Sequence, residues 1–374
     1  MMKPAASSMA SVVATDATQA IPAIRSDVRA MHGYAIQPAA GLVKLDAMEN
    51  PFRLNQALQS ELGARLGAVP VNRYPATSHA DVLSALADHV GLPAGCSLLL
   101  GNGSDEIIAM LSTACRTPGA TVLTPVPSFV MYETLAQLQG LAFVGVPLTA
   151  HFDLDQEAML GAVEQHRPAL TYLAYPNNPS ANLFAEEVID RIVALVGAQG
   201  DGLVVFDEAY QPFSSRTWMQ RMAQRPHVLV MRTMSKFGLA GVRLGYLAGA
   251  SAVIAEIDKV RLPYNISALN AEAVLFALAH VDEFTRQAAV LRDERARLQT
   301  LLKALPSVRA FPSEANMVLV RVPDSKSAFE GMKSRGVLVK HMSGVHRLLS
   351  NCLRITVGTP EENDLMMAAL KASL

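Results

Sequence analysis

Short apolar runs alternate with longer segments of helical periodicity between about residues 98 and 248. In two of the longer segments, Asp105–Ala114 and Glu186–Leu195, apolar residues recur every three to four positions. The apolar runs, each predicted to be a strand, are Leu98–Leu100, Thr121–Thr124, Ala142–Val146, Leu170–Ala174, Leu203–Asp207, Val228–Met231 and Leu244–Ala248. Runs that are continuously apolar are typical of a sheet covered on both faces. The pattern therefore predicts an α/β fold with a mostly parallel sheet.

The pattern changes after Pro263. Ser267–Leu305 is rich in Ala, Leu and Arg and predicts a helix, followed by strands at Met317–Val322 and Leu353–Val357 and a closing helix from Pro360. Because helices and strands no longer alternate, we expect a second, smaller α+β domain. The expected division is an N-terminal arm and part of the small domain (1–47), a large domain (48–265) and a small C-terminal domain (266–374).

Composition and charge narrow the function classes. The chain has 374 residues, 51% of them hydrophobic, with a formal net charge of -1. This profile is typical of a folded enzyme with small-molecule partners, and it argues against nucleic acid or an anionic membrane, which require a basic surface. The three cysteines are widely spaced, which favours reduced thiols in the cytoplasm. Residues 1–20 lack the long apolar stretch of a secretory signal, so we expect a loose N-terminal arm.

Polar residues follow the predicted strands, where ligands of open α/β sheets bind. These segments are Gly101–Glu106, Pro125–Phe129, Tyr175–Ser180, Asp207–Tyr210, Arg232–Lys236 and, just before the last strand, Arg243. Together they supply a helix N-terminus, an aromatic ring, an amide, a carboxylate, a phenol, a lysine and an arginine. This set suits a phosphorylated aromatic cofactor that carries an aldehyde. The histidines show no spacing typical of metal ligands, so we assign no metal.

Three motifs in this region resemble those of the fold-type-I pyridoxal-phosphate-dependent aminotransferases. They are Tyr-Pro-Asn-Asn-Pro at 175–179, Phe-Asp-Glu-Ala-Tyr at 206–210, and Thr-Met-Ser-Lys-Phe-Gly-Leu-Ala-Gly-Val-Arg at 233–243. Each motif is weak alone, but their order and separation are specific. The resemblance extends over nearly the whole chain after residue 25. It implies a seven-stranded, mostly parallel sheet in the large domain and pyridoxal 5'-phosphate as the cofactor.

The resemblance also implies roles around the cofactor ring. Lys236 would bond to the aldehyde, which requires a neutral amine, and would later shuttle a proton. Asp207 would keep the ring nitrogen protonated. Tyr210 and Asn178 would hydrogen-bond the ring hydroxyl, and Phe129 would stack on the ring. Simpler readings are a helix N-cap for Asp207, a turn residue for Asn178 and a core side chain for Phe129.

The cofactor phosphate requires an anion site. The N-terminus of the helix predicted after Gly101 would direct the backbone N–H groups of Ser104 and Asp105 at the phosphate. The resemblance adds the hydroxyls of Thr233 and Ser235 and the guanidinium of Arg243. The glycine pattern here lacks the third small residue of a dinucleotide fingerprint and the Gly-Lys-Ser/Thr of a P-loop.

Other segments resemble the histidinol-phosphate aminotransferase family in particular. These segments are residues 41–52, Arg73-Tyr74-Pro75, Gly101–Glu106 and Cys352–Pro360. The resemblance places Tyr34, Asn50, Lys340 and Arg354 at the substrate, and it implies a homodimer in which Tyr74 reaches the active site of the partner subunit. An arginine fork at Arg354 suits a carboxylate and a phosphate equally, so Arg354 alone does not decide the substrate.

This chain departs from the family pattern at three positions. Lys340 stands where many relatives have arginine, which retains the charge without the bidentate fork. Ser180-Ala181 replaces the common Thr-Gly, and Phe129 replaces a tyrosine, which loses one hydrogen bond. Plain alternatives are a packed aromatic for Tyr34 and a solvated strand residue for Lys340.

The expected reaction interconverts imidazole-acetol phosphate and L-glutamate with L-histidinol phosphate and 2-oxoglutarate, a step of histidine biosynthesis. Two alternatives stay open on the same scaffold: an aromatic amino acid aminotransferase and a decarboxylase of a phosphorylated amino acid. A regulator that binds the cofactor without catalysis would need a DNA-binding module. The residues ahead of Tyr34 are too few and too weakly basic to form one.

Overall fold

The computed structural model describes residues 23–31, 33, 37–75 and 78–374. The chain divides into two compact units, Met1–Pro38 and Ala39–Leu374. In the first unit, the short helix α1 (Ser26–Ala30) follows Arg25, which pairs with Asp27. All of the described sheet structure belongs to the second unit.

The larger sheet has seven strands in the order β2-β8-β7-β6-β5-β3-β4, as the resemblance implied. The strands are β2 (Cys96–Gly101), β3 (Thr121–Val126), β4 (Ala142–Pro147), β5 (Leu170–Ala174), β6 (Leu203–Asp207), β7 (Val228–Thr233) and β8 (Gly245–Ala250). Only β8 runs antiparallel to its two neighbours. The α/β fold with a mostly parallel sheet is therefore confirmed, and the strand ends differ from the predicted ones by at most two residues.

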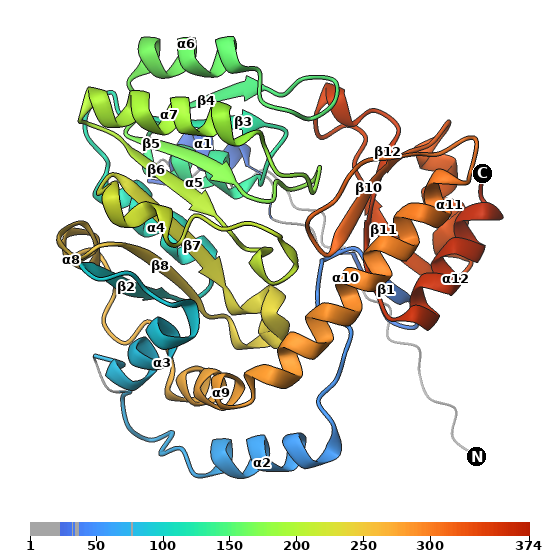
Figure 1. Cartoon of the computed structure of the whole chain (residues 1–374), viewed down its shortest axis with the longest axis horizontal. Coiled ribbons are helices and arrows are strands. Elements are labelled where there is room, and N and C mark those ends of the chain that lie inside the picture. The colour runs from blue at the N-terminus through green and yellow to red at the C-terminus, as the bar shows by residue number, and fades with distance from the viewer. Residues whose placement is uncertain (1–22, 32, 34–36, 76–77) are drawn as a thin grey trace. The chain divides into compact units, whose positions relative to one another are not determined.

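Helices cover both faces of this sheet (Figure 1), which explains why its strands are continuously apolar. Leu98 and Leu100 pack in one core with α3 (Ala80–Val90), α6 (Gln156–His166), α7 (Glu186–Gln199) and α9 (Ala268–Ala279). Leu99, on the opposite face, packs in a second core with α4 (Ser104–Ala114), α5 (Met131–Gln139) and α8 (Ser251–Asp258). Successive side chains of β2 thus enter different cores.

A smaller five-stranded sheet has the order β1-β11-β12-β10-β9. Its strands are β1 (Val43–Leu45), β9 (Arg309–Ala310), β10 (Met317–Arg321), β11 (Val337–His341) and β12 (Cys352–Thr356). It packs against α10 (Val281–Lys303), α11 (Ser325–Ser334) and α12 (Pro360–Lys371), which lie beside it in Figure 1. Because β1 pairs in parallel with β11, residues from the beginning of the second unit complete a sheet otherwise built from its end.

The single helix predicted for Ser267–Leu305 is wrong in one respect. His280 leaves helical geometry (φ -117°, ψ 31°) and separates α9 from α10. The two helices differ in their packing. α9 packs on α3 and on α2 (Gln56–Gly67), whereas α10 begins in the same core with Phe284 and then carries Leu291 and Leu298 into the core of the smaller sheet. Among the described residues, no helix is long and apolar enough to span a membrane.

Candidate active site

The polar segments predicted to lie together do so at one edge of the larger sheet. Gly101 at the end of β2 pairs with Gly245 at the start of β8, and Gly245 pairs in turn with Thr233 at the end of β7. Asp207 ends β6, next in the sheet order. The antiparallel direction of β8 is what brings Arg243, two residues before it, to the same edge.

An anion cradle lies where α4 begins. Gly103 (φ 82°) precedes α4 and carries no side chain to cap the first N–H groups of the helix. A Cβ atom at Gly245 would lie 2.9 Å from the backbone nitrogen of Ser104, and one at Gly103 would lie 2.6 Å from Nη2 of Arg243. Arg243 also contacts the carboxylate of Asp105 at 3.4 Å. Glycines therefore keep backbone donors and a guanidinium close together, as a phosphate site requires.

Two hydroxyl groups follow β7 at the same edge. Thr233 Oγ1 donates to Ser235 Oγ at 3.0 Å and accepts from the backbone nitrogen of Ser235 at 3.1 Å. Both residues are buried. This local pair fixes the turn that leads into Lys236, and it adds neutral donors beside the cradle.

Lys236 presents an amine that is easily deprotonated. Burial, together with the guanidinium groups of Arg354 and Arg243, lowers the pKa of Lys236 to about 8. Its Nζ donates to the backbone oxygen of Ala47 at 3.0 Å. A lysine that reacts with an aldehyde must be neutral, and this environment favours the neutral form.

Asp207 is a buried carboxylate whose hydrogen-bond donors, in the part of the chain that the structure describes, are neutral. The Tyr132 hydroxyl donates to Oδ2 at 2.6 Å, and the backbone nitrogen of Ala209 donates to Oδ1 at 3.0 Å. Burial raises the pKa of Asp207 to about 6 against the lowering effect of these bonds. A cationic ligand placed here would restore the ionised form. The helix N-cap reading does not hold, since the next helical turn, Gln211–Phe213, begins four residues later.

Aromatic residues surround Asp207. Tyr132 stacks on Tyr172 with ring centroids 4.5 Å apart, and it meets the half-buried Phe129 edge to face at 5.6 Å. Tyr210 is 5% exposed and lies three residues after Asp207. The carboxylate therefore lies in an aromatic, poorly solvated environment, which is the physical reason for its raised pKa.

The smaller sheet contributes two cations. Arg354 on β12 donates from Nη1 to Oδ1 of Asn178 at 2.7 Å and from Nη2 to the backbone oxygen of Asp46 at 2.8 Å. Lys340 on β11 stands directly opposite Arg354 in the antiparallel register of the two strands. Directly paired residues of antiparallel strands lie on the same face of a sheet, so the two positive side chains share one face.

The other predicted substrate residues that the structure describes, Asn50 and Tyr74, differ in where they lie relative to Lys236. Asn50 donates to Gln287 at 2.9 Å and lies close to Gly238, two residues after Lys236. Tyr74 is 80% exposed and stacks on Tyr264 at 4.5 Å, so it does not join the edge formed by its own chain. Tyr34 lies outside the described residues.

Sequence reasoning missed two parts of this site. Tyr132 reaches Asp207 from α5, and the only signal was a tyrosine on the apolar face of a predicted helix, where a buried hydroxyl needs a partner. The segment Asp46–Met48 contributes backbone carbonyl groups, which no residue pattern reveals.

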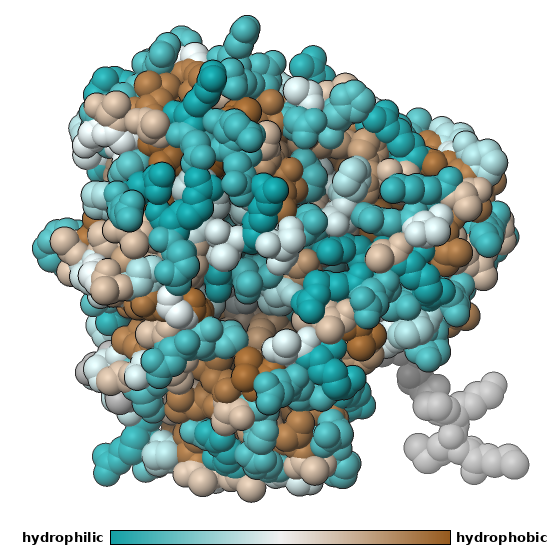
Figure 2. Space-filling view, viewed as in Figure 1, coloured by the Kyte–Doolittle hydropathy of each residue, from teal (hydrophilic) through white to brown (hydrophobic). Residues whose placement is uncertain are grey.

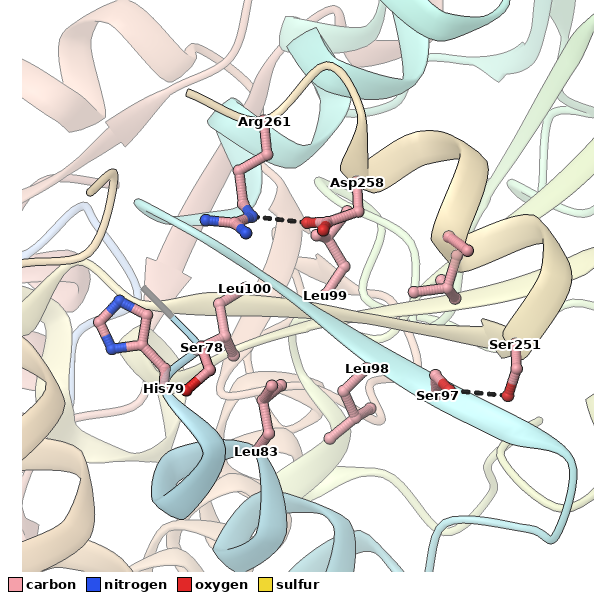
Figure 3. Close-up of a pocket in the computed structure, with 12 residues that line it drawn as sticks. Ser78, His79, Leu83, Ser97, Leu98, Leu99, Leu100, Ser251, Asp258 and Arg261 are labelled. Carbon is pink, nitrogen blue, oxygen red and sulfur yellow. Dashed lines mark hydrogen bonds and ion pairs between the residues drawn. The ribbon is translucent and has the colours of Figure 1, made fainter. Parts of the chain in front are cut away.

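A separate pocket of about 290 Å³ lies along β2 (Figure 3). Its rim carries the Arg261–Asp258 ion pair and the Ser97–Ser251 hydrogen bond, and leucines of β2 form its floor. It contains none of the predicted site residues. Among the described residues, no cluster of three or more His, Cys, Asp or Glu side chains could hold a metal ion.

The donor set at the sheet edge fits one kind of prosthetic group. Glycine-lined backbone and guanidinium donors, a buried acid with neutral donors among the described residues, and an amine of lowered pKa fit the phosphate, the ring nitrogen and the aldehyde of pyridoxal phosphate. Fold and site together define a pyridoxal-phosphate-dependent enzyme of fold type I.

Comparison with known proteins gives the family. Residues 41–370 match the family "Aminotransferase class I and II", and the chain belongs to this family. A histidinol-phosphate aminotransferase of Methylibium petroleiphilum is 68% identical over 351 residues, covering 94% of each chain. One of Paracidovorax citrulli is 60% identical over 95% of this chain and 98% of its own.

A solved structure of similar shape is also known. Histidinol-phosphate aminotransferase from Sinorhizobium meliloti, in complex with pyridoxal-5'-phosphate, has a TM-score of 0.80 at 26% identity and covers 94% of this chain and 98% of its own. The fold class and the expectation of a pyridoxal-phosphate-dependent aminotransferase are confirmed. The roles of individual site residues stay predictions.

Proposed function

We propose that this aminotransferase interconverts imidazole-acetol phosphate and L-glutamate with L-histidinol phosphate and 2-oxoglutarate in histidine biosynthesis. The names of relatives at 60% and 68% identity over nearly the full chain support this substrate. The structural observation that carries the proposal is the pair of cations Arg354 and Lys340 on one sheet face. Two positive charges suit a phosphate dianion better than a single carboxylate.

Arg354 is the expected contact for both substrates. It is 8% exposed, and Asn178 and the Asp46 carbonyl hold its guanidinium in place. The half-buried Lys340 adds charge without fixed geometry, which allows the same pocket to accept the carboxylate of glutamate. Asn50 and Tyr34 are proposed as further substrate contacts.

Residues of the sheet edge would hold and tune the cofactor. Bound pyridoxal phosphate supplies an aldehyde that accepts the amino group and a ring that withdraws electrons from the substrate carbon. Ser104 and Asp105 N–H groups, the hydroxyls of Thr233 and Ser235, and Arg243 bind its phosphate.

Four other residues bind its ring. Asp207 holds the proton on the ring nitrogen, Tyr210 and Asn178 donate to the ring hydroxyl, and Phe129 packs on the ring face. Lys236 would hold the aldehyde of the cofactor. Its amine, when free, would move the proton from the substrate α-carbon.

We also propose a homodimer in the cytoplasm, with Tyr74 contributing to the active site of the partner subunit. The support is a set of exposed apolar side chains from two segments of the chain that meet where Tyr74 stacks on Tyr264. These side chains are Val71, Tyr74, Leu262 and Tyr264. Apolar residues also gather over α9 on the face seen in Figure 2. Exposed aromatic and aliphatic clusters of this kind favour burial against a second copy. Analytical ultracentrifugation tests the dimer, and complementation between Tyr74→Ala and Lys236→Ala subunits tests the shared site.

The cofactor assignment is tested with Lys236→Ala. In the wild-type enzyme the absorption band of bound pyridoxal phosphate should shift on addition of glutamate. Lys236→Ala should lose that response and turn over at least about 10³-fold more slowly. Lys259→Ala is the matched control, because Lys259 is an exposed lysine paired with Glu256. A wild-type band and rate in Lys236→Ala would contradict the assignment.

The substrate is tested by comparing amino donors with the purified holoenzyme. We expect kcat/KM for histidinol phosphate to exceed that for phenylalanine, and Lys340→Ala to lower the former more than the latter. A preference for phenylalanine would indicate an aromatic amino acid aminotransferase. Release of carbon dioxide without any need for a keto acid would indicate a decarboxylase.

A further inference from the structure

The segment Asp46–Met48, here called the strap, contacts two residues of the proposed site with adjacent carbonyl groups. The backbone oxygen of Asp46 accepts from Nη2 of Arg354 at 2.8 Å, and that of Ala47 accepts from Nζ of Lys236 at 3.0 Å. The strap follows β1 and leads toward α2 (Figure 1). One short piece of backbone therefore touches both the substrate cation and the reactive amine.

Two buried side chains fix the strap from the smaller sheet. The backbone nitrogen of Met48 donates to Oγ1 of Thr356 at 3.0 Å, and the backbone oxygen of Met48 accepts from Nδ2 of Asn316 at 3.0 Å. Thr356 ends β12 and Asn316 directly precedes β10. They are 2% and 0% exposed. Met48 has a φ of 54°, a conformation that a methionine adopts only where surrounding contacts impose it.

We infer that Thr356 and Asn316 are positioning residues of the amino-transfer reaction, which act through the strap on Lys236. This inference rests on the proposed role of Lys236. When the amine of Lys236 is not bonded to the cofactor, it needs a hydrogen-bond acceptor that holds it within reach of the substrate α-carbon. The Ala47 carbonyl is that acceptor, and its position depends on the two bonds to Met48.

Thr356 and Asn316 do not contact Lys236, but they would affect the rate of proton transfer through the position of the Ala47 carbonyl. A carbonyl that shifts by about 1 Å no longer aligns the amine, and misplacement of that size can cost up to about 10²-fold in rate. Arg354 is less dependent on the strap, since Asn178 also holds its guanidinium. Loss of the anchors should therefore reduce proton transfer more than substrate binding.

Thr356→Val tests the inference because it keeps the shape of the side chain and removes the acceptor for Met48. In the holoenzyme we expect kcat to fall about fivefold or more, with a smaller change in KM for glutamate. The primary isotope effect with 2-deuterated glutamate should increase, since proton transfer becomes slower relative to other steps. Thr356→Ser should restore both values. Thr171→Val is the matched control, because Thr171 is a fully buried threonine on β5 away from the strap.

A second readout uses the apoprotein. The pH dependence of chemical acylation at Lys236, followed by peptide mass spectrometry, reports the pKa of its amine. Losing the Ala47 carbonyl removes an acceptor that favours the charged amine, so the midpoint should fall in Thr356→Val and Asn316→Ala and return in Thr356→Ser. This measurement requires neither cofactor nor turnover.

The outcomes distinguish failure of the strap inference from failure of the proposed role of Lys236. If Thr356→Val folds, and its isotope effect and acylation midpoint equal those of the wild type, the strap inference is overturned while the role of Lys236 stands. If Thr356→Val unfolds, Asn316→Ala and Asn316→Asp provide the same test from the other anchor. If Lys236→Ala retains the wild-type rate, the proposed function fails first.

Discussion

Two buried carboxylates stand next to each other at the end of β6, and their surroundings differ. Glu208 is 1% exposed and forms an ion pair with Arg232, whose Nη2 lies 2.8 Å from Oε2. Arg232 Nε donates to Glu208 at 2.9 Å, and the Thr217 hydroxyl donates at 2.9 Å. Asp207 is 5% exposed, yet its hydrogen-bond donors are a phenol and a backbone amide, and the pKa of Asp207 rises to about 6.

The difference separates a structural ion pair from a binding site. A buried carboxylate with its own arginine is complete within the fold. Among the described residues the donors to Asp207 are neutral, so a cationic ligand would stabilise its ionised form. The protonated ring nitrogen of pyridoxal phosphate is the partner that we propose for Asp207. Substitutions at the two positions should therefore have opposite consequences, one for turnover and the other for folding.

The largest expected effect comes from Asp207→Asn. The amide keeps the shape but cannot hold a proton on the ring nitrogen, so kcat should fall about 10³-fold. Folding of the apoprotein at pH 7 should be unimpaired or improved, because a buried charge is removed. Steady-state kinetics and thermal unfolding measure the two quantities. If Asp207→Asn turned over at the wild-type rate, the proposed role of Asp207 at the ring nitrogen would be wrong.

Glu208→Gln should instead destabilise the protein. It leaves the buried guanidinium of Arg232 without its anion, which costs about 3 to 5 kcal/mol of unfolding free energy. The double variant Glu208→Gln/Arg232→Met removes both charges and should recover much of the loss. Urea unfolding measures both, and equal stability of Glu208→Gln and wild type would show that the pair is not structural.

The pH dependence of apoprotein stability sharpens the comparison. The folded pKa of Asp207, about 6, lies above the unfolded value near 3.8. The stability that protonated Asp207 contributes is therefore complete below about pH 3.8 and is lost as pH rises through about 6. Relative to Asp207→Asn, the unfolding free energy of the wild type should fall by up to about 3 kcal/mol across this range. In the holoenzyme the fall should be smaller, since a cation then faces the carboxylate.

Tyr132→Phe should have the smallest effect. It removes a donor that favours ionised Asp207, so the pKa of Asp207 rises further and the acidic limb of the rate profile moves to higher pH. We expect about a tenfold loss of kcat near pH 6 and a smaller loss near pH 8. A uniform loss at all pH values would mean that Tyr132 acts by packing instead.

The sequence by itself determined most of the fold and identified the main candidate cofactor-binding residues. Continuous apolar runs fixed the doubly covered sheet, because a strand without a polar face must be buried on both sides. The residues after those runs had to meet at one edge, since parallel strands present their carboxyl ends together. Lys236, Asp207 and Arg243 followed from that rule and from motif spacing.

Only the tertiary structure decided how these groups are tuned and held. The break at His280 separates a helix that packs on α2 and α3 from one that continues into the core of the smaller sheet, and helical periodicity does not show such a change of packing partner. Tyr132 and the strap act through a hydroxyl brought from another helix and through backbone carbonyls, neither of which leaves a residue pattern. The motif singled out Asp207, but only the fold shows how the two neighbouring carboxylates differ. Glu208 lies against Arg232, whereas a phenol and a backbone amide donate to Asp207.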